Sequence, residues 1–258
     1  MFHHSMQASR YELKYIVDEG QAATLREFMR SYLTPDPYTR PEEGNAYWVY
    51  SLYCDSTRLA LYQLSKEGRR NRFKLRMRFY DADPDHPVYL EVKRRLGEVI
   101  KKERAGVRRT AAQKYLSGYQ PRLVDLTPDQ DPKKAASALS NFCNLYSSIS
   151  AMACVYVYFH REAYVAWDNN NIRVTFDRRV CADRFHHANS LMPPRQGLLT
   201  DIPGVILELK FTDRYPAWMR ELVKTLNLWR VPVAKYLAGL EKIGTPWPAL
   251  PHVYGAAS

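Results

Sequence analysis

The segment from residue 72 to residue 80 constrains the fold more than any other part of the sequence. It reads R-F-K-L-R-M-R-F-Y, so basic and hydrophobic side chains alternate. Successive side chains of a β-strand point to opposite faces. One face therefore carries Arg72, Lys74, Arg76 and Arg78, and the other carries Phe73, Leu75, Met77 and Phe79. Four cations in a row repel one another unless anionic groups lie among them, so the pattern predicts a strand with one charged, partnered face.

Charged residues recur at alternate positions in five other segments that we expect to be strands. These positions are Arg10, Glu12 and Lys14; Glu91, Lys93 and Arg95; Lys102 and Arg104; Arg173 and Asp177; and Glu208 and Lys210. A single strand of this kind is typical of a sheet face turned to water. Six such strands are better explained by a closed barrel whose charged faces converge on an enclosed lumen. The hydrophobic faces would then point outward, beneath covering helices.

Period-two patterns predict eight strands in all, which favours antiparallel pairing. They are Arg10–Val17, Tyr47–Cys54, Arg72–Tyr80, Val88–Arg95, Glu98–Gly106, Ala153–Ala166, Asn171–Val180 and Val205–Phe211. Helical periodicity follows a capping box formed by Asp18 and Gln21, and recurs from Leu139 to Tyr146. Weaker helix signals cover Ser56–Lys66, Thr110–Ser117 and Pro216–Leu228. We therefore expect an α+β fold in which a closed eight-stranded antiparallel barrel with helices packed outside forms a single domain over residues 1–258.

Two segments are expected to be long loops. They run from Gln120 to Asp131 and from Asp183 to Asp201, and the second is expected near one mouth of the barrel. The four cysteines show no C-x-x-C spacing, which favours buried free thiols over disulfides or a zinc site.

The charge balance indicates an anionic partner. The chain has 38 Lys and Arg against 27 Asp and Glu, for a net charge of +11. The longest hydrophobic run, Ile149–Phe159, is too short to span a bilayer, and no signal-peptide pattern opens the sequence. We therefore expect a cytoplasmic protein without transmembrane segments.

A lumen lined with basic side chains suits a chain of phosphates. Arginine binds phosphate oxygens in a bidentate manner, lysine adds a point charge, and a shielded site strengthens both interactions. The carboxylates of Glu12, Glu91, Asp177 and Glu208 admit two interpretations. They bind Mg²⁺ or Mn²⁺ together with the phosphates, or they balance the charge of neighbouring basic residues.

Other functions with an anionic partner are less well supported. A nucleic-acid-binding protein would agree with the charge, but no helix-turn-helix, zinc-finger or RNP pattern occurs. The sequence also lacks the G-x-x-x-x-G-K-[ST] loop of P-loop kinases. A triphosphatase and a non-catalytic polyphosphate binder both remain alternatives, because each would use the same lumen.

The order and spacing of several short motifs resemble the VTC domain, the polyphosphate-polymerase branch of the triphosphate tunnel metalloenzymes. The motifs are R-Y-E-L-K-Y from residue 10, Y-S-L-Y-C-D-S from 50, K-L-R-M-R-F-Y from 74, Y-L-E-V-K-R-R from 89, K-E-R from 102, F-H-R-E-A-Y from 159, R-V-T-F-D from 173, I-L-E-L-K-F from 206 and K-Y from 235. Arg10 departs from the related triphosphatase and cyclase branch, which has a glutamate there, and this weakens a simple triphosphatase or cyclase interpretation.

The resemblance implies an ATP-dependent polyphosphate polymerase with Mn²⁺ or Mg²⁺ as cofactor and with ATP and inorganic polyphosphate as substrates. It implies that the catalytic phosphate ligands are Lys14, Arg76, Arg78, Lys93, Arg161, Arg173 and Lys210. Lys102 and Lys235 would be further phosphate ligands, and Glu208 would bind the metal. The alternating pattern itself adds Arg10, Lys74 and Arg104 as expected substrate-binding residues.

Overall fold

The computed structural model describes residues 10–39, 44–97, 99–167, 172–186, 190–212 and 214–244. Its main feature is one antiparallel sheet, in the strand order β1-β10-β8-β7-β3-β4-β5-β6. These strands are β1 (Arg10–Val17), β3 (Ala46–Asp55), β4 (Asn71–Phe79), β5 (Val88–Leu96), β6 (Val99–Val107), β7 (Met152–Ala166), β8 (Arg173–Arg184) and β10 (Val205–Thr212). All eight predicted strands are confirmed, although Glu98 and Asn171, at the predicted starts of two of them, lie outside the described residues.

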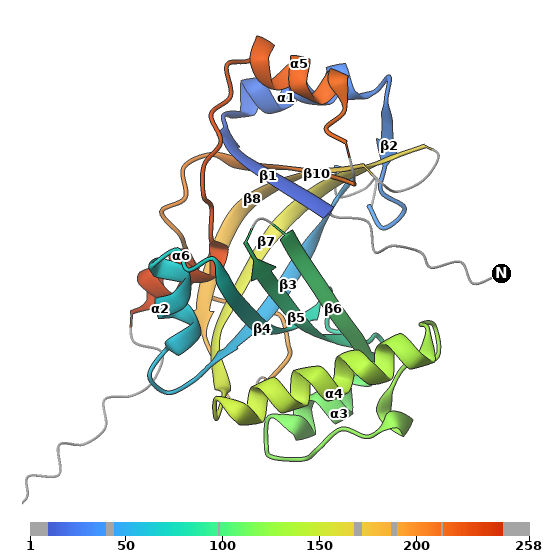
Figure 1. Cartoon of the computed structure of the whole chain (residues 1–258), viewed down its shortest axis with the longest axis vertical. Coiled ribbons are helices and arrows are strands. Elements are labelled where there is room, and N and C mark those ends of the chain that lie inside the picture. Colours follow the sequence, from blue (N-terminus) through green and yellow to red (C-terminus); the bar gives the residue numbers. More distant parts are fainter. Residues whose placement is uncertain are drawn as a thin grey trace, which may run out of the picture.

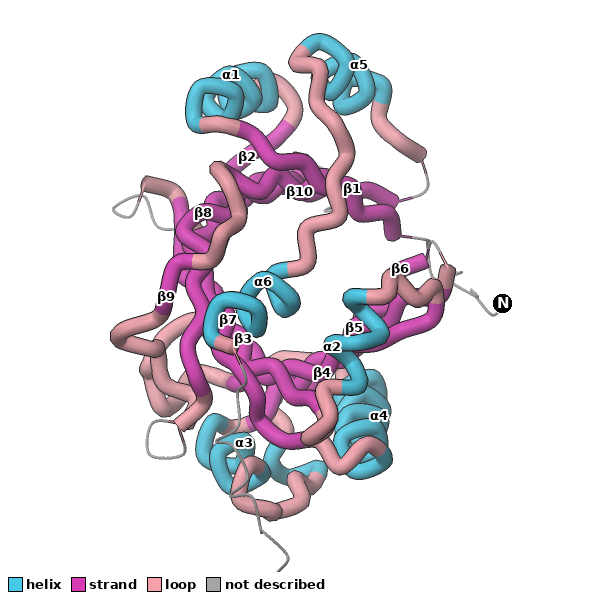
Figure 2. The backbone as a smooth tube through the Cα atoms, turned by 90° about the vertical axis from the view of Figure 1, so that its left-hand side faces the viewer, coloured by secondary structure: helices cyan, strands magenta, loops and turns pink. Residues whose placement is uncertain are grey.

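The strands curve around a central space, and the path ends at β1 and β6 (Figure 2). The predicted closure of the barrel is not confirmed, because no backbone pairing joins these two strands in the part of the chain that the structure describes. The free edge of β1 instead contacts a later segment: Tyr15 forms an antiparallel bridge with Arg230, and Val231 N donates to Lys14 O at 2.9 Å. The fold is therefore α+β with a large open antiparallel sheet.

Helices cover the outer face of the sheet at opposite ends of the molecule (Figure 1). Of the described helices, α1 (Glu19–Met29) and α5 (Ala217–Thr225) lie at one end, and α3 (Arg109–Tyr115) and α4 (Pro132–Ser148) lie at the other. The helices α2 (Ala60–Lys66) and α6 (Lys235–Ile243) contact each other away from these ends. The predicted capping box begins α1, since Asp18 Oδ1 accepts from Gln21 N at 2.7 Å and Gln21 Oε1 accepts from Asp18 N at 3.1 Å. This cap satisfies backbone donors that the first helical turn leaves unpaired.

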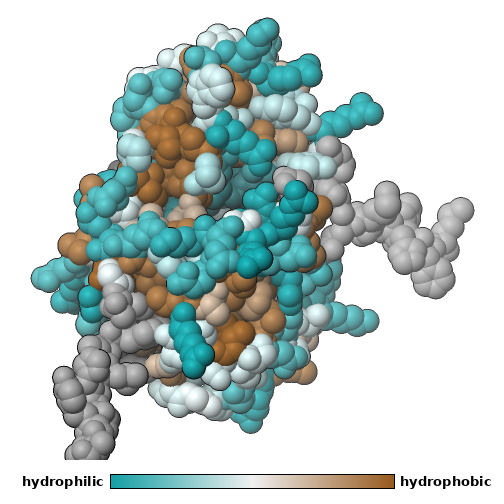
Figure 3. Space-filling model, turned by 60° about the vertical axis from the view of Figure 1, so that its left-hand side comes forward, coloured by the Kyte–Doolittle hydropathy of each residue, from teal (hydrophilic) through white to brown (hydrophobic). Residues whose placement is uncertain are grey.

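Two hydrophobic clusters join the helices to the outer face. In one, Leu75 and Met77 of β4 pack with Phe142 of α4. In the other, Leu209 of β10 packs with Leu25 of α1. The hydrophobic faces of the strands therefore point outward, as the alternating pattern predicts. On the face drawn in Figure 3, hydrophobic side chains gather in two areas separated by a hydrophilic band.

Helix α6 is not predicted from the sequence. It packs against the inner face of the sheet, where Tyr236 and Leu240 join Val155, Val157 and other residues in a third cluster. Figure 2 shows α6 inside the ring of strands. One end of the enclosed space is therefore filled by hydrophobic side chains.

The segment predicted as a loop near a mouth of the barrel occupies a different position. Its described parts extend β8 to Arg184, form the short strand β9 (Leu198–Leu199) beside β8, and pack on β7. Leu191 N donates to the Tyr156 hydroxyl at 2.8 Å, and Gly197 N donates to the Tyr158 hydroxyl at 3.0 Å. The prediction is wrong for these residues, because both tyrosines belong to the outer face of β7. Residues 187–189 of this segment lie outside the described residues.

Smaller features complete the fold. A short strand, β2 (Leu33–Pro35), pairs with β7, and the predicted loop from Gln120 to Asp131 contains a 3-10 helix, η2 (Leu123–Asp125). The four cysteines are free, with Cys54 and Cys154 buried and the other two half-buried. Within the described ranges, no helix has the length and hydrophobicity needed to cross a bilayer.

Candidate functional site

The charged face of β4 points toward the inside of the ring. Arg76 lies opposite Tyr53 of β3 and Glu91 of β5, and Arg78 lies opposite Ser51 of β3. Arg78 donates to the Ser51 hydroxyl from both Nε and a terminal nitrogen, each at 3.3 Å. Directly opposed residues of an antiparallel pair share a face, so these side chains form one continuous inner surface.

Glu91 gathers the basic side chains of one wall. It is completely buried, and it accepts from Arg76 Nε at 2.7 Å and from Lys102 Nζ at 3.2 Å. Arg78 and Arg104 approach it to 3.9 Å. Burial favours the neutral acid, but Arg76, Arg78 and the other two cations outweigh burial and hold the pKa of Glu91 well below its ordinary value. Glu91 is therefore an anion surrounded by four cations.

Glu208, on the opposite wall, is likewise surrounded by four basic side chains. One of its oxygens lies 2.6 Å from Lys210 Nζ and 3.5 Å from Arg161, and the other lies 2.9 Å from Lys235 Nζ and 3.3 Å from Lys14 Nζ. The residue is 4% exposed. Burial again opposes ionisation, but the four cations, with Lys210 foremost, hold the pKa of Glu208 well below its ordinary value.

Asp177 extends this second cluster. Arg161 donates to both carboxylate oxygens of Asp177, at 2.6 and 2.7 Å, and Lys235 Nζ lies 2.6 Å away. Asp177 is fully buried. Because Lys235 contacts both Asp177 and Glu208, the first residue of α6 is fixed to the charged surface. Burial and the bidentate pair have opposite effects, and Arg161 holds the pKa of Asp177 below its ordinary value.

An ion pair spans the open edge of the sheet. Lys93 of β5 donates to both oxygens of Glu12 of β1, at 2.9 and 3.2 Å. Lys14 lies 3.2 Å from Glu12, which connects this pair to Glu208. The two walls are therefore linked by side chains where the backbone pairing stops.

Two predicted basic residues have different surroundings. Arg173 contacts the buried Asp36 at 2.5 Å and donates to the Tyr47 hydroxyl at 3.0 Å, so it faces inward through partners that the sequence analysis does not identify. Lys74 lies over the ring of Tyr236, 5.8 Å from its centroid, and has no carboxylate within ion-pair distance among the described residues.

The pKa values of several inner lysines are lowered. Burial is the largest cause for each. Nearby Lys14 and Lys93 add to it at Lys74, whose pKa is well below its ordinary value. The pKa of Lys210 falls to about 8, because burial outweighs its carboxylate partner. The pKa of Lys102 falls to about 7 by loss of hydration although its side chain is 38% exposed, so Lys102 lies at the edge of the inner surface. These lysines therefore hold their protons less tightly than ordinary lysines, and they are the groups on the inner surface that an added anion would recharge.

A metal ion would need ligands from outside the protein. In the part of the chain that the structure describes, no three His, Cys, Asp or Glu side chains gather to hold one. Magnesium at phosphate sites commonly uses one or two carboxylates and takes its other ligands from phosphate and water. Glu208 fits this mode, but a metal ion must displace at least one of the basic groups that its oxygens now contact.

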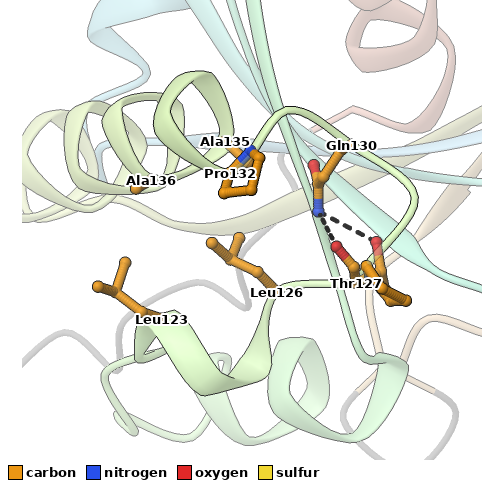
Figure 4. Close-up of a pocket in the computed structure, with 8 residues that line it drawn as sticks. Leu123, Leu126, Thr127, Gln130, Pro132, Ala135 and Ala136 are labelled. Carbon is orange, nitrogen blue, oxygen red and sulfur yellow. Dashed lines mark hydrogen bonds between the residues drawn. The ribbon is translucent and has the colours of Figure 1, made fainter.

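A hydrophobic pocket lies outside the charged surface. Its cavity volume is about 270 Å³, and it lies between η2 and the start of α4, lined by Leu123, Leu126 and Ala135 among others (Figure 4). The Gln130 side chain closes one side by donating to Thr127 O at 2.9 Å. The pocket has no basic residue among its lining, so it is unsuited to phosphate.

Most of the predicted site residues come together in the structure. The inner surface collects Lys14, Lys74, Arg76, Arg78, Lys93, Lys102, Arg104, Arg161, Arg173, Lys210 and Lys235 around Glu12, Glu91, Asp177 and Glu208. The side chain of Arg10 lies outside what the structure describes, although its backbone pairs with Thr212. The sequence analysis misses Asp36, Tyr47, Ser51 and Tyr53, although the last three share the parity of the inner face of β3.

A family model places this arrangement among known proteins. The VTC domain model matches residues 9–243, which is nearly the whole chain. The chain belongs to the VTC domain family. The resemblance found in the motifs is thereby confirmed, and membership supports a polyphosphate-related or triphosphatase-type function for this VTC domain.

Three solved structures are distantly similar to the chain. No curated protein matches the sequence. A candidate adenylate cyclase from Bacillus halodurans aligns over 88% of this chain and 95% of its own, with 12% identity and a TM-score of 0.48. A protein from Pyrococcus horikoshii aligns over 91% and 99%, with 12% identity and a TM-score of 0.43. A chain of the Schizosaccharomyces pombe Mediator head module aligns over 85% and 91%, with 9% identity and a TM-score of 0.39. These likenesses are too distant to bear on the function of the VTC domain.

Proposed function

We propose that this VTC domain is a polyphosphate polymerase that transfers the γ-phosphoryl group of ATP to the end of a polyphosphate chain, with Mn²⁺ or Mg²⁺ as cofactor. The observation that carries the proposal is the excess of inward-facing basic side chains over the carboxylates that they surround. A protein interior does not normally concentrate uncompensated positive charge. A chain of phosphates supplies the missing negative charge along the whole surface.

The lowered lysine pKa values support the same ligand. In the free protein, Lys74 and Lys210 hold their protons less tightly than ordinary lysines do. An anion placed among them would favour their charged forms and raise these pKa values again. Phosphate binding is thus coupled to proton uptake by the inner lysines.

In the proposed reaction, the bond between the γ-phosphorus of ATP and its β,γ-bridging oxygen breaks. A terminal oxygen of the polyphosphate chain forms the new bond to that phosphorus, and ADP leaves with the bridging oxygen. Phosphoryl transfer depends mainly on positioning and charge stabilisation. Arg76 and Arg78 would hold phosphate oxygens from one wall, and Lys210 and Arg161 from the other, so that donor and acceptor lie in line.

Glu208 would hold the metal ion, which when bound supplies further positive charge to the transferring phosphoryl group. Lys210 and Lys235, which now contact Glu208, would then be free to move to phosphate oxygens. The carboxylates of Asp177 and Glu91 would keep their arginine partners oriented during the reaction.

The test is to incubate the purified protein with ATP and Mn²⁺ and to resolve the products by size. Long phosphate chains and ADP are expected. Glu208→Gln should lower turnover about a hundredfold or more, the scale of losing one major electrostatic stabiliser. Glu103→Gln is the matched control, because Glu103 pairs with Lys101 and Asn141, away from the inner surface, and should keep wild-type turnover.

The products separate the alternatives. Inorganic phosphate as the first product, without longer chains, would identify a triphosphatase. Binding of polyphosphate without consumption of ATP under Mg²⁺ or Mn²⁺, and without any effect of Glu208→Gln, would identify a non-catalytic binder.

A further inference from the structure

In the part of the chain that the structure describes, helix α6 leaves one end of the ring free, and that end is the entrance we consider for a nucleotide. At the other end, Tyr236 of α6 stacks on Tyr53 of β3, with ring centroids 4.7 Å apart. A Cβ atom added to Gly239 of α6 would lie 2.6 Å from a methyl group of Val157, which shows how closely the helix meets β7. Tyr53 lies near the carboxyl end of β3, so the accessible end is the one where β3 begins.

Three tyrosines form a row at that accessible end. Tyr47 is the second residue of β3, Tyr80 directly follows β4, and Tyr89 is the second residue of β5. The centroids of Tyr47 and Tyr80 are 6.0 Å apart and those of Tyr80 and Tyr89 are 6.2 Å apart, both with edge-to-face geometry. All three side chains are half-buried. The strands therefore carry a continuous aromatic rim that keeps some contact with solvent.

The rim is continuous with the phosphate-binding surface. Tyr89 lies opposite Arg78 in the sheet, and the Arg104 guanidinium lies 3.5 Å from the centroid of the Tyr89 ring. The Tyr47 hydroxyl accepts from Arg173. Aromatic surface and arginine forks thus alternate over one short stretch of the inner face.

We propose that Tyr80, Tyr89 and Arg104 form the subsite for the base of the nucleotide, while its triphosphate extends inward along Arg78 toward Glu91 and Glu208. The inference rests on the proposed function, because it assigns a place to the part of ATP that the basic side chains do not explain. Tyrosine rings and guanidinium planes both stack on nucleobases. Phosphates placed first at Arg78 leave the base beside Tyr89, its direct neighbour across the sheet.

This subsite would select bases by their stacking area. Stacking on rings and guanidinium groups tolerates different bases, because every base has a π-face. We therefore expect similar affinities for ATP and GTP, within about threefold, and weaker binding of UTP, whose base is smaller.

The experiment measures the dissociation constants of ATP and of tripolyphosphate by calorimetry. Tyr80→Leu should weaken the binding of ATP about tenfold, the scale of one stacked base, and should leave the dissociation constant of tripolyphosphate unchanged. Tyr80→Phe is the matched control, because it keeps the ring and should keep the wild-type ratio. The melting temperature of each variant confirms that it is folded.

A second measurement needs no variant. Wild-type protein should bind ribose 5-triphosphate, which has no base, about tenfold more weakly than ATP. Equal affinities for these two ligands, or an equal loss of ATP and tripolyphosphate binding in Tyr80→Leu, would overturn the subsite and leave the phosphate-binding function intact. Failure of the wild-type protein to bind tripolyphosphate would instead contradict the proposed function itself.

Discussion

The inner lysines differ from one another although they share one surface. Lys14 contacts two carboxylates, Glu12 and Glu208, which outweigh burial and hold its pKa above the ordinary value. Lys210 contacts Glu208 at 2.6 Å, yet burial and the nearby Arg161 lower its pKa to about 8. The balance between burial and partners, and not the residue type, decides which lysines are charged in the free protein.

The pKa of Lys210 predicts a pH dependence of ligand binding. Below about pH 8 the folded protein carries a charged Lys210, and this charge is lost as the pH rises through that value. We expect the affinity for tripolyphosphate to fall about tenfold more between pH 7 and pH 9 in the wild-type protein than in Lys210→Arg, which stays charged. Calorimetry at several pH values measures the difference, in which the titration of the ligand itself cancels.

The lowered pKa of Lys210 makes the stability of the fold rise with pH, although the affinity for the ligand falls. Its pKa is lower in the folded protein than the ordinary value of 10.5, so the unfolded chain binds the proton more tightly. Between about pH 8 and pH 10.5 the contribution of Lys210 to the free energy of unfolding therefore rises with pH. If Lys210→Arg shows the same pH profiles as the wild-type protein for both binding and unfolding, the lowered pKa is wrong.

Neighbouring residues of β4 should respond to substitution in opposite ways. Arg78→Ala should weaken tripolyphosphate binding at least several-fold, because Arg78 faces the inner surface. Met77→Ala should instead lower the free energy of unfolding by about 2 to 5 kcal/mol, because Met77 is fully buried beneath the outer helices. Binding assays and denaturant titrations of both variants test the facing of the strand. Wild-type affinity in Arg78→Ala would contradict it.

At the scale of elements, the sequence predicts those whose pattern is local. The strand β4 is predicted from its alternation alone, and α1 from its capping box and hydrophobic spacing. The helix α6 is missed because its hydrophobic side chains face the inside of a sheet, a position that depends on strands distant in sequence. The short strands β2 and β9 are missed because segments of two or three residues are too short to show an alternation of polar and hydrophobic side chains.

The contact between α6 and β7 predicts an unusual response to a glycine substitution. Replacing a helical Gly by Ala normally stabilises a helix by about 1 kcal/mol. In Gly239→Ala the new Cβ would meet the Val157 methyl group at 2.6 Å, so we expect a net loss of about 1 to 3 kcal/mol. Adding Val157→Ala removes that methyl group. The free energy of unfolding lost in the double variant should therefore be smaller than the sum of the losses in the two single variants. Thermal unfolding measures all three, and a stabilised Gly239→Ala would show that α6 does not pack this closely.

At the scale of the whole molecule, the inverted arrangement of charged and hydrophobic faces could be predicted, but the closure of the sheet could not. The alternation of charged and hydrophobic residues in each strand predicts which face is charged. Whether β1 meets β6 depends on what else reaches the edge of β1, and there Tyr15 pairs with Arg230. Nothing near residue 230 in the sequence indicates a partner more than two hundred residues earlier. The roles of the charged residues in catalysis stay predictions.

A ligand that neutralises the inner surface should stabilise the entire fold. Tripolyphosphate at about a hundred times its dissociation constant would add about 2.7 kcal/mol to the free energy of unfolding. The accompanying rise in melting temperature should shrink as salt increases, because the attraction is electrostatic. Arg108→Ala, which removes an exposed arginine outside the inner surface, should keep the full rise. A rise that does not depend on salt would argue against charge neutralisation.

The edge that the ion pair between Lys93 and Glu12 bridges is where we expect the sheet to open first. Separating β3 from β7 would break a long series of backbone hydrogen bonds, whereas separating β1 from β5 and β6 breaks contacts between side chains. Local opening of the sheet should therefore begin between β1 and β6. Deuterium should replace the amide protons on the facing edges of these strands well before those of β3 and β7, and disrupting the ion pair with Glu12→Gln should accelerate that exchange without changing the exchange at the centre of the sheet.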